Sequence, residues 1–179
     1  MKTDKKKVGF VSLGCPKNLV DSEVIMGQLQ DAGYEITNSA DDAETVVVNT
    51  CGFIESAKEE SIEAILEATQ MKADGKAKRV VVAGCLVERY RDELMKDLPD
   101  VDAFIGTNQL DKIIDATEKD KKDFSETQLT PIGNKTATYL YDEYTPRLRA
   151  TDSHTAFIKI AEGCDRPCAF CSIPSMRGS

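Results

Sequence analysis

The stretch Thr45-Val46-Val47-Val48-Asn49-Thr50-Cys51-Gly52 decides the fold class of this chain. Its β-branched residues predict a strand over 45–49, and the absence of apolar–polar alternation is typical of a strand that is buried on both faces. The stretch Arg79-Val80-Val81-Val82-Ala83-Gly84-Cys85 repeats the pattern. Two strands of this kind indicate a parallel sheet that is covered by helices on both sides.

Strand and helix patterns alternate on both sides of these two stretches. Further strands are predicted over residues 8–13, 34–37 and 102–105, and helices begin at Pro16 and near Ser56, Leu86 and Leu110. This alternation predicts a doubly wound α/β domain with a parallel sheet over residues 1–118. The domain lacks the Gly-x-Gly-x-x-Gly fingerprint and the phosphate loop with its lysine, so a bound dinucleotide or nucleoside triphosphate is not indicated.

The predicted helix near Ser56 carries both a start signal and an apolar face. Ser56 and Glu59 have the spacing of a capping box, which satisfies the free N–H groups at a helix start. The face with spacing i, i+3, i+4, i+7 consists of Ile62, Ile65, Leu66 and Thr69. The sequence therefore predicts that these four side chains pack against the sheet.

The composition is that of a globular protein, with 41% apolar residues, 30% charged residues and a net charge of −8. Phosphate binding requires clustered lysine and arginine, and the chain has no dense basic stripe, so we expect no strong nucleic-acid binding. A basic protein partner fits the charge better than a nucleic acid does, but acidic surfaces are common and mostly serve solubility. No run of about 18 apolar residues predicts a membrane span. The apolar run at 8–13 is too short for the core of a signal peptide. We therefore expect a cytoplasmic protein without membrane contact.

Six cysteines and a single histidine restrict the chemistry of the chain. The cytoplasm keeps thiols reduced, so metal binding or catalysis is a better expectation than disulfides. The histidine, His154, stands just before a predicted strand and is interpreted as a surface residue at a strand edge. A mechanism that requires histidine would depend on this residue alone, and we predict no catalytic side chain.

Cys15, Cys51 and Cys85 each follow a predicted strand and stand next to a glycine. In the flavodoxin-like strand order 2-1-3-4-5 these strands are neighbours, about 4.8 Å apart, and ligands bind outside their carboxyl ends. The three thiols would then converge on one centre, where the glycines let a bulky cluster approach the backbone. The competing interpretation is three buried structural cysteines. A zinc site lacks an evident fourth ligand, and spacing alone does not name the metal.

Cys164, Cys168 and Cys171 form a Cys-x3-Cys-x2-Cys motif directly after a strand predicted over residues 155–161. Three thiolates on one tight loop can hold three irons of a cubane, which leaves the fourth iron open to a substrate. A zinc knuckle is the alternative, but it needs a second cysteine pair, and none follows Cys171. The motif, with Phe170 between its last two cysteines, resembles that of the radical S-adenosylmethionine (SAM) superfamily, in which the open iron binds SAM.

Residues 119–153 are predicted to be a linker between two domains. They contain the charge run 119–123 and the structure-breaking residues Pro131, Gly133, Asn134 and Pro146. Tyr139, Tyr141 and Tyr144 are expected to anchor this linker against a neighbouring surface. Residues 154–179 are predicted to begin a second domain that is incomplete.

Both cysteine sets, in this order, resemble the methylthiotransferase family over essentially the whole chain. Within the family, the segment Ser12-Leu13-Gly14-Cys15-Pro16-Lys17-Asn18-Leu19-Val20-Asp21-Ser22-Glu23 looks like the branch that modifies a ribosomal protein. The branches that act on tRNA carry Gln-Met-Asn or Lys-Val-Asn where this chain has Pro16-Lys17-Asn18. Residues 144–147 and 153–156 also look like the ribosomal-protein branch. Asn18, Asp21 and Glu23 carry the branch signature and are expected to cap or pack the helix.

The resemblance implies a radical SAM methylthiotransferase that modifies the β-carbon of an aspartate in the twelfth small-subunit ribosomal protein. It implies one [4Fe–4S] cluster that binds SAM and a second, auxiliary [4Fe–4S] cluster, with a reductase as electron donor. The implied ligands are Cys164, Cys168 and Cys171 for the first of these clusters, and Cys15, Cys51 and Cys85 for the auxiliary one.

The resemblance also implies a radical SAM barrel and a TRAM domain after the α/β domain. A complete barrel needs about 200 residues or more, so only its first strand and its cluster loop fit into residues 154–179. We therefore expect the chain to be an N-terminal fragment that is inactive alone. Two alternatives stay open, a tRNA adenosine methylthiotransferase and a non-catalytic iron–sulfur or zinc protein.

Overall fold

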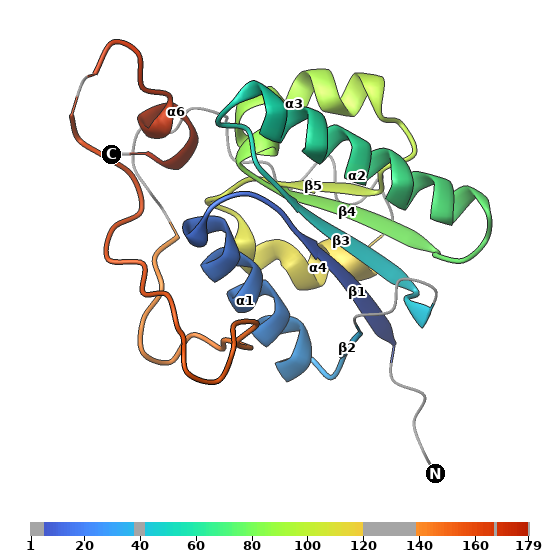
Figure 1. Ribbon diagram of the computed structural model, residues 1–179. Coiled ribbons are helices and arrows are strands. Elements are labelled where there is room, and N and C mark those ends of the chain that lie inside the picture. The colour runs from blue at the N-terminus through green and yellow to red at the C-terminus, as the bar shows by residue number, and fades with distance from the viewer. Residues whose placement is uncertain (1–5, 38–41, 120–138, 167, 179) are drawn as a thin grey trace.

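A five-stranded parallel sheet lies at the centre of the computed structural model, which describes residues 6–37, 42–119, 139–166 and 168–178 (Figure 1). Its strands are β1 (Lys7–Ser12), β2 (Glu35–Thr37), β3 (Thr45–Thr50), β4 (Arg79–Gly84) and β5 (Ala103–Ile105). They follow the order β2-β1-β3-β4-β5, and each neighbouring pair is parallel. The predicted α/β class and the strand order 2-1-3-4-5 are confirmed.

Helices cover both faces of this sheet, as the two unalternating valine runs predict. The helices are α1 (Pro16–Asp31), α2 (Glu55–Ala73), α3 (Cys85–Asp97), the short η2 (Leu110–Lys112), α4 (Ile113–Glu118) and, near the C-terminus, α6 (Ile173–Arg177). Figure 1 shows α1 and α4 on one face and α2 and α3 on the other. Val47 packs with Ile25 and Ile113 on the first face, whereas Val46 and Val48 belong to the cluster on the second.

Helix α2 differs from its prediction at its start and in its buried face. It begins at Glu55, with Ile54 at the N-cap and no side-chain capping bond. The predicted Ser56–Glu59 capping box is therefore wrong, because Ser56 already lies inside the first turn. The buried side chains are Ser61, Ile65 and Ala68. Leu66 is 50% exposed, because successive helical residues point about 100° apart and only one side of α2 meets the sheet.

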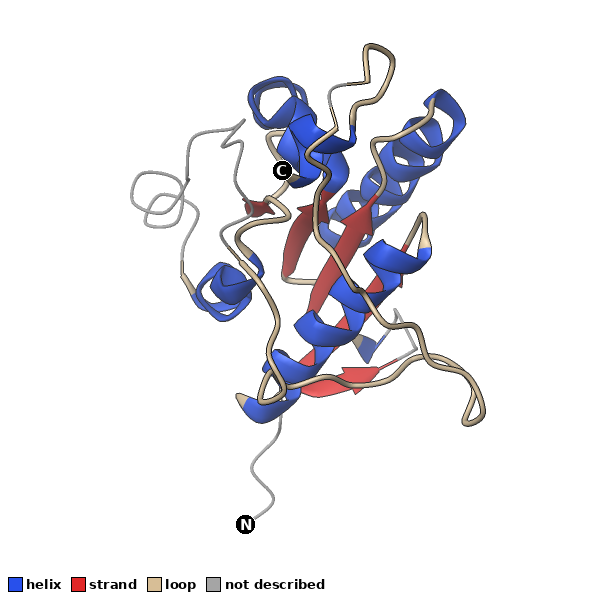
Figure 2. Cartoon of the chain, turned by 90° about the vertical axis from the view of Figure 1, so that its left-hand side faces the viewer, coloured by secondary structure: helices blue, strands red, loops and turns tan. Residues whose placement is uncertain are grey.

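The chain from residue 139 onward lies across α1, as Figures 1 and 2 show from two sides. Tyr139 and Tyr141 are partly buried against the core, as predicted, but Tyr144 is 83% exposed and does not anchor the segment. The proposed linker residues 120–138, with Pro131, Gly133 and Asn134, lie outside the described residues. The domain boundaries at 118 and 153 therefore stay predictions.

The strand predicted over residues 155–161 is wrong, since the structure has irregular chain there. Ile158 is 82% exposed and Ile160 is 94% exposed. A strand requires a neighbouring strand to pair its backbone groups, and within the described residues the sheet ends at β2 and β5. The alternating apolar residues over 155–161 therefore do not form a strand of this sheet.

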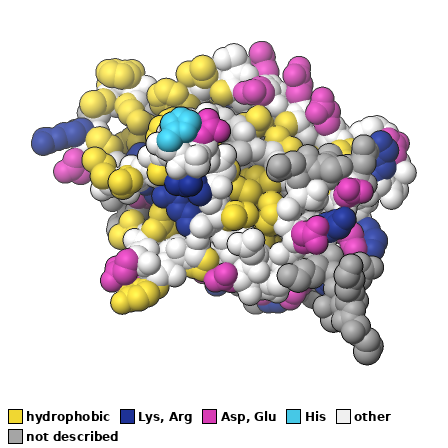
Figure 3. Space-filling model, turned by 60° about the horizontal axis from the view of Figure 1, so that its bottom comes forward, with side chains coloured by type: hydrophobic (Ala, Val, Ile, Leu, Met, Phe, Trp, Pro, Cys, Tyr) yellow, Lys and Arg dark blue, Asp and Glu magenta, His cyan; other side chains and the backbone are white. Residues whose placement is uncertain are grey.

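One further expectation concerns the exposure of the single histidine. The single histidine, His154, is exposed (cyan in Figure 3), although no strand follows it. Among the described residues, no helix has the length and apolar character that crossing a membrane requires.

Candidate functional site

The first cysteine set lines one pocket at the carboxyl ends of the central strands. Cys15 is the N-cap of α1, Cys51 follows the last residue of β3, and Cys85 is the first residue of α3, directly after β4. All three line the same pocket of about 490 Å³, together with Ile173 and Met176 of α6. The parallel order β1-β3-β4 is what brings three residues so distant in sequence to one edge of the sheet.

Local structure gives these thiols a setting that suits anionic sulfur. Cys15 and Cys85 stand at the N-termini of α1 and α3, where the helix dipole favours negative charge. Gly14 has a φ of 91°, and a Cβ on it would lie 2.8 Å from the Cβ of Cys51. Any other residue at position 14 would strain the turn and displace Cys51. The glycine thus keeps the floor of the pocket open.

A serine of α2 fixes the backbone of Cys51. The Ser61 hydroxyl is completely buried and accepts a hydrogen bond from the Cys51 N–H at 3.0 Å. It can donate in turn to the carbonyl of Ala57, 2.7 Å away. The hydrogen bond with Cys51 therefore explains why a serine is buried on an otherwise apolar face of α2.

Cys85 is a buried thiol in contact with an arginine. Burial is the main cause that raises its pKa to about 11, and the positive charge of Arg177 opposes this rise. Arg177 Nε donates a hydrogen bond to Cys85 Sγ at 3.2 Å. The guanidinium therefore offsets part of the burial cost of a thiolate, which is the form of cysteine that binds metals.

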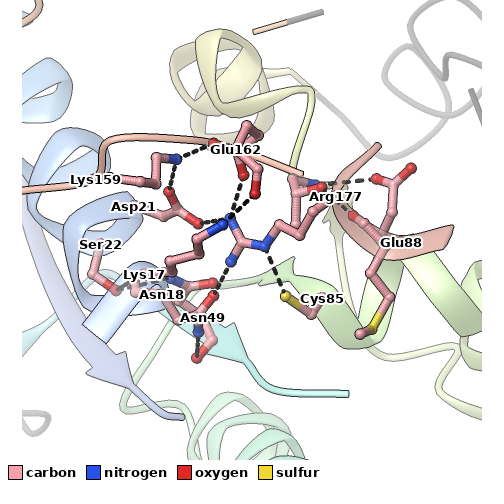
Figure 4. Close-up of polar contacts among 12 residues, drawn as sticks. Lys17, Asn18, Asp21, Ser22, Asn49, Cys85, Glu88, Lys159, Glu162 and Arg177 are labelled. Atoms are coloured by element: carbon pink, nitrogen blue, oxygen red, sulfur yellow. Dashed lines mark hydrogen bonds and ion pairs between the residues drawn. The ribbon is translucent and has the colours of Figure 1, made fainter. Parts of the chain in front are cut away.

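Arg177 belongs to a buried charge cluster, which we define as Asp21, Lys159, Glu162 and Arg177 (Figure 4). Its Nη1 lies 2.5 Å from Asp21 Oδ2 and 2.7 Å from Glu162 Oε1. Burial by itself lowers the pKa of Arg177, but the negative charges of Cys85, Asp21 and Glu162 outweigh it and hold that pKa above its ordinary value. The guanidinium is thus a fixed positive charge beside the cysteine pocket.

The second cation completes the buried charge cluster. Lys159 Nζ lies 2.8 Å from Asp21 Oδ1, forms an ion pair with Glu162 and stands 3.9 Å from the centre of the Tyr141 ring. The Tyr141 hydroxyl donates a hydrogen bond to Asp21. Burial, followed by the Asp21 charge, raises the pKa of Tyr141, so the phenol stays a donor. Two carboxylates and two cations balance each other, as buried charges require.

Sequence reasoning named Asp21, Asn18 and Glu23 only as a signature and missed the cationic partners. In the structure Asn18 accepts from Arg177 at 3.2 Å, and Glu23 is completely buried and holds Arg147 and the Ala150 N–H. One signal was available in α1 itself. Its acids stand among Val20, Val24 and Ile25 on a helix that is apolar on every side, so they had to be buried and paired.

The second cysteine set lies on irregular chain between Glu162 and α6. Cys164 and Cys171 are half-buried and Cys168 is exposed. The Cys171 N–H donates to the Cys168 carbonyl at 3.1 Å, and the Cys164 N–H donates to the Gly178 carbonyl at 3.0 Å. Lys17 of α1 also donates to the Glu162 carbonyl. The loop is therefore tied to α1 at its start and to the chain after α6.

Neither set is contracted around a single metal ion. Among the residues that the structure describes, no three Cys, His, Asp or Glu side chains lie close enough together to hold one. The first set instead surrounds a pocket whose lining, among the described residues, holds three thiols and the Met176 thioether but no fourth thiol and no imidazole. Tetrahedral zinc needs a fourth ligand at close range, whereas an iron–sulfur cluster is larger and is held by thiolates. The donor set therefore fits a cluster with one open iron.

Comparison with protein families gives one match to this part of the molecule. Residues 7–106 match the family described as uncharacterized protein family UPF0004. The match begins at β1 and ends just after β5, so it covers the sheet and all three cysteines of the first set.

Curated relatives match nearly the whole chain. The chain is 54% identical over 173 residues to a protein of Solibacter usitatus, 46% identical over 213 residues to one of Koribacter versatilis and 50% identical over 174 residues to one of Bdellovibrio bacteriovorus. Each is named ribosomal protein uS12 methylthiotransferase RimO. The matches cover 97–98% of this chain but only 35–42% of the relatives, so the chain spans well under half of their length.

Proposed function

Because the chain belongs to the family described as uncharacterized protein family UPF0004, and its longer relatives are named uS12 methylthiotransferases, we propose that it is the cluster-binding part of such an enzyme. The proposed reaction adds a methylthio group to the β-carbon of an aspartate in ribosomal protein uS12. The proposed enzyme class is a radical SAM transferase of a sulfur-containing group.

The observation that carries this proposal is the pocket shared by Cys15, Cys51 and Cys85. We propose that these thiolates hold an auxiliary [4Fe–4S] cluster and that Cys164, Cys168 and Cys171 hold the cluster that binds SAM. When bound, the two clusters would supply the sulfur to be transferred and the electron that cleaves SAM to a radical.

The protein's own residues would bind, position and shield these groups. Gly14 leaves room beside Cys51, and Ser61 fixes the Cys51 backbone. Phe53 and Ile54 line the same pocket and are more than half exposed, so they surround its opening with apolar surface. A carbon–hydrogen bond at an aspartate β-carbon is not acidic, so no side-chain base is required of the site, which agrees with the single exposed histidine.

The proposed substrate also defines the partners and the compartment. A ribosomal protein places the reaction in the cytoplasm, and a reductase is needed to deliver the electron. The net charge of −8 suits a basic protein surface as substrate. We propose no strong nucleic-acid binding by this segment, and no membrane contact.

Iron content tests the cluster assignment directly. We expect the anaerobically reconstituted chain to bind about eight irons, four for each cubane. Alanine at Cys15, Cys51 and Cys85 should remove about four of these irons, and alanine at Cys164, Cys168 and Cys171 should remove the other four. Bound zinc without visible absorption would instead support the non-catalytic zinc alternative.

Product analysis distinguishes the two possible substrates. In a strain that lacks the gene, mass spectrometry should show uS12 without its methylthio mass and tRNA with unchanged modification. Loss of a methylthio group from tRNA, with uS12 intact, would instead identify a tRNA adenosine methylthiotransferase.

The isolated chain offers a further test of the proposed division of labour. A SAM barrel alone needs about 200 residues or more, so we expect this chain of 179 residues to release no 5′-deoxyadenosine from SAM with dithionite as reductant. Release at a rate above that of the Cys164, Cys168 and Cys171 alanine variant would contradict this expectation.

A further inference from the structure

Arg177 is the point at which the C-terminal part of the chain touches the first cysteine set. Its side chain is only 4% exposed, and its Nε lies 3.2 Å from Cys85 Sγ. Arg177 stands on α6, six residues after Cys171, whereas Cys85 opens α3. A side chain that follows the second cysteine set in sequence therefore contacts a cysteine of the first set.

Three acceptors from two other parts of the chain fix the orientation of this guanidinium. Asp21 and Asn18 of α1 accept at 2.5 Å and 3.2 Å, and Glu162, just before the second set, accepts at 2.7 Å. The Thr107 hydroxyl donates to the carbonyl of Met176, the preceding residue, at 2.7 Å. With its other nitrogens held in this way, Nε has one direction left, toward Cys85.

A donor aimed at a ligand sulfur changes the electronics of an iron–sulfur cluster. Hydrogen bonds to cysteine sulfur, net charge and solvent exposure set the reduction potentials of such clusters. A positively charged donor favours the reduced cluster, because reduction adds negative charge. Burial strengthens the effect, since water does not screen it.

We infer that Arg177 tunes the reduction potential of the cluster at the first cysteine set by donating to Cys85 Sγ. This inference rests on the proposed function, which places a cluster there. Arg177 acts through the ligand, so it is a positioning residue. Glu162, two residues before the second set, also accepts a hydrogen bond from this guanidinium.

Redox titration of a single-cluster chain tests this inference. Alanine at Cys164, Cys168 and Cys171 leaves only the first set, and the reconstituted full chain should carry about four irons. We expect Arg177→Gln to shift the midpoint potential, followed by electron paramagnetic resonance, to a more negative value. Arg177→Lys keeps the charge but not the Nε donor, and should shift the potential in the same direction by less.

Two matched variants separate the hydrogen bond from charge in general. Lys159→Gln also removes one positive charge from the buried charge cluster, but Lys159 contacts Asp21 and Glu162, whereas Arg177 donates to Cys85 Sγ. This variant should therefore shift the potential less than Arg177→Gln does. Arg149→Gln removes an exposed arginine and should leave the potential unchanged.

The outcomes distinguish this inference from the proposed function. Iron bound by the single-cluster chain, with equal potentials for the parent and Arg177→Gln, overturns the inference alone. Equal shifts for Arg177→Gln and Lys159→Gln also overturn it, because charge rather than the donor would then be responsible. A single-cluster chain that binds no iron overturns the cluster assignment itself and this inference with it. If Arg177→Gln fails to fold by circular dichroism, the Arg177→Lys titration decides.

Discussion

Glu23 is a completely buried acid in the middle of α1, and its carboxylate holds the chain that crosses the helix. Oε2 accepts from Arg147 Nε at 2.7 Å, and Oε1 accepts from the Ala150 N–H at 2.8 Å. The Glu23 carbonyl also accepts from the Leu148 N–H at 2.9 Å. Glu23 thus accepts hydrogen bonds from Arg147, Leu148 and Ala150 of the chain that lies across α1 from residue 139 onward, which we call the crossing segment.

Removal of this carboxylate should weaken the fold measurably. Glu23→Ala leaves the Ala150 N–H without its acceptor and Arg147 with the Phe157 carbonyl alone, so we expect the free energy of unfolding in urea to fall by about 1–3 kcal/mol. The control is Glu44→Ala, because Glu44 forms an exposed ion pair with Lys78 at 3.0 Å. That change should cost less than about 1 kcal/mol, and equal costs at the two sites would contradict the role given to Glu23.

At the residue scale, the sequence predicted where the cysteines lie in the fold better than it predicted which side chains contact them. Cys15, Cys51 and Cys85 were correctly expected at strand ends, because each stands next to a glycine where an apolar, β-branched run stops. The contact between Cys85 and Arg177 joins residues 92 positions apart. No local pattern reports such a pairing, so the arginine could be found only once the fold was known.

Helix α2 shows how an element can be predicted correctly while its orientation is not. The helix forms as expected, but it presents Ile65 to the sheet and leaves Leu66 half exposed. Periodicity gives the angle between residues, whereas the sheet decides which side is buried. The neighbouring apolar residues Ile65 and Leu66 are therefore a matched pair for a stability test.

We expect truncation at these two neighbours to have very different effects. Ile65 is fully buried, so Ile65→Ala should lower the free energy of unfolding by about 2–5 kcal/mol through lost burial and a cavity. Leu66→Ala removes a side chain that is 50% exposed and should cost less than about 1 kcal/mol. Urea titration of both variants measures this, and a larger cost at Leu66 would mean that α2 is rotated.

The contact between α1 and the crossing segment depends on Gly27. A Cβ at this position would lie 2.5 Å from the backbone nitrogen of Arg147 and the carbonyl carbon of Pro146. Gly27→Ala favours the helix itself by up to about 1 kcal/mol but removes the space for the segment. If this overlap costs about 1.4 kcal/mol, the population of molecules in which the crossing segment is detached from α1 rises about tenfold.

We therefore expect trypsin to cut Gly27→Ala after Arg147 or Arg149 about tenfold faster than the parent. Mass spectrometry of the early fragments identifies these cuts. Gln30→Ala, at an exposed position of the same helix, is the control and should be cut at the parental rate. Unchanged cleavage of Gly27→Ala would show that the segment does not need close contact with α1.

At the scale of the whole molecule, the α/β domain could be predicted and the course of the later chain could not. Buried β-branched strands mark the sheet locally, so the fold class followed from the sequence, whereas the strand order was assumed to be the flavodoxin-like one and agrees with the structure. The segment over 155–161 has strand-like alternation, but it lies on α1 as irregular chain, where Phe157, Lys159 and Ala161 help to line a pocket beside Pro16. Its course is set by the ion pairs of Lys159 with Asp21 and of Glu162 with Arg177, and no local pattern in the sequence predicts these pairings.

The buried charge cluster therefore joins the two parts of the chain as a unit, and its members should not act independently. Asp21→Asn alone leaves two buried cations facing one carboxylate, and Lys159→Met alone leaves the opposite imbalance. Each change should lower the free energy of unfolding by about 3–5 kcal/mol. The double variant restores a balanced charge, so its cost should be smaller than the sum of the two by about 0.5–3 kcal/mol.

Urea unfolding of the four proteins in this cycle measures the coupling. The corresponding cycle at the exposed pair, Glu44→Gln and Lys78→Met, serves as the reference, because solvent-exposed ion pairs contribute at most about 1 kcal/mol. Additive costs at Asp21 and Lys159 would mean that each residue stabilises its own neighbourhood. In that case the crossing segment would be held by Glu23 and Gly27, and the second cysteine loop would be tied to α1 mainly through Lys17 and Asn18.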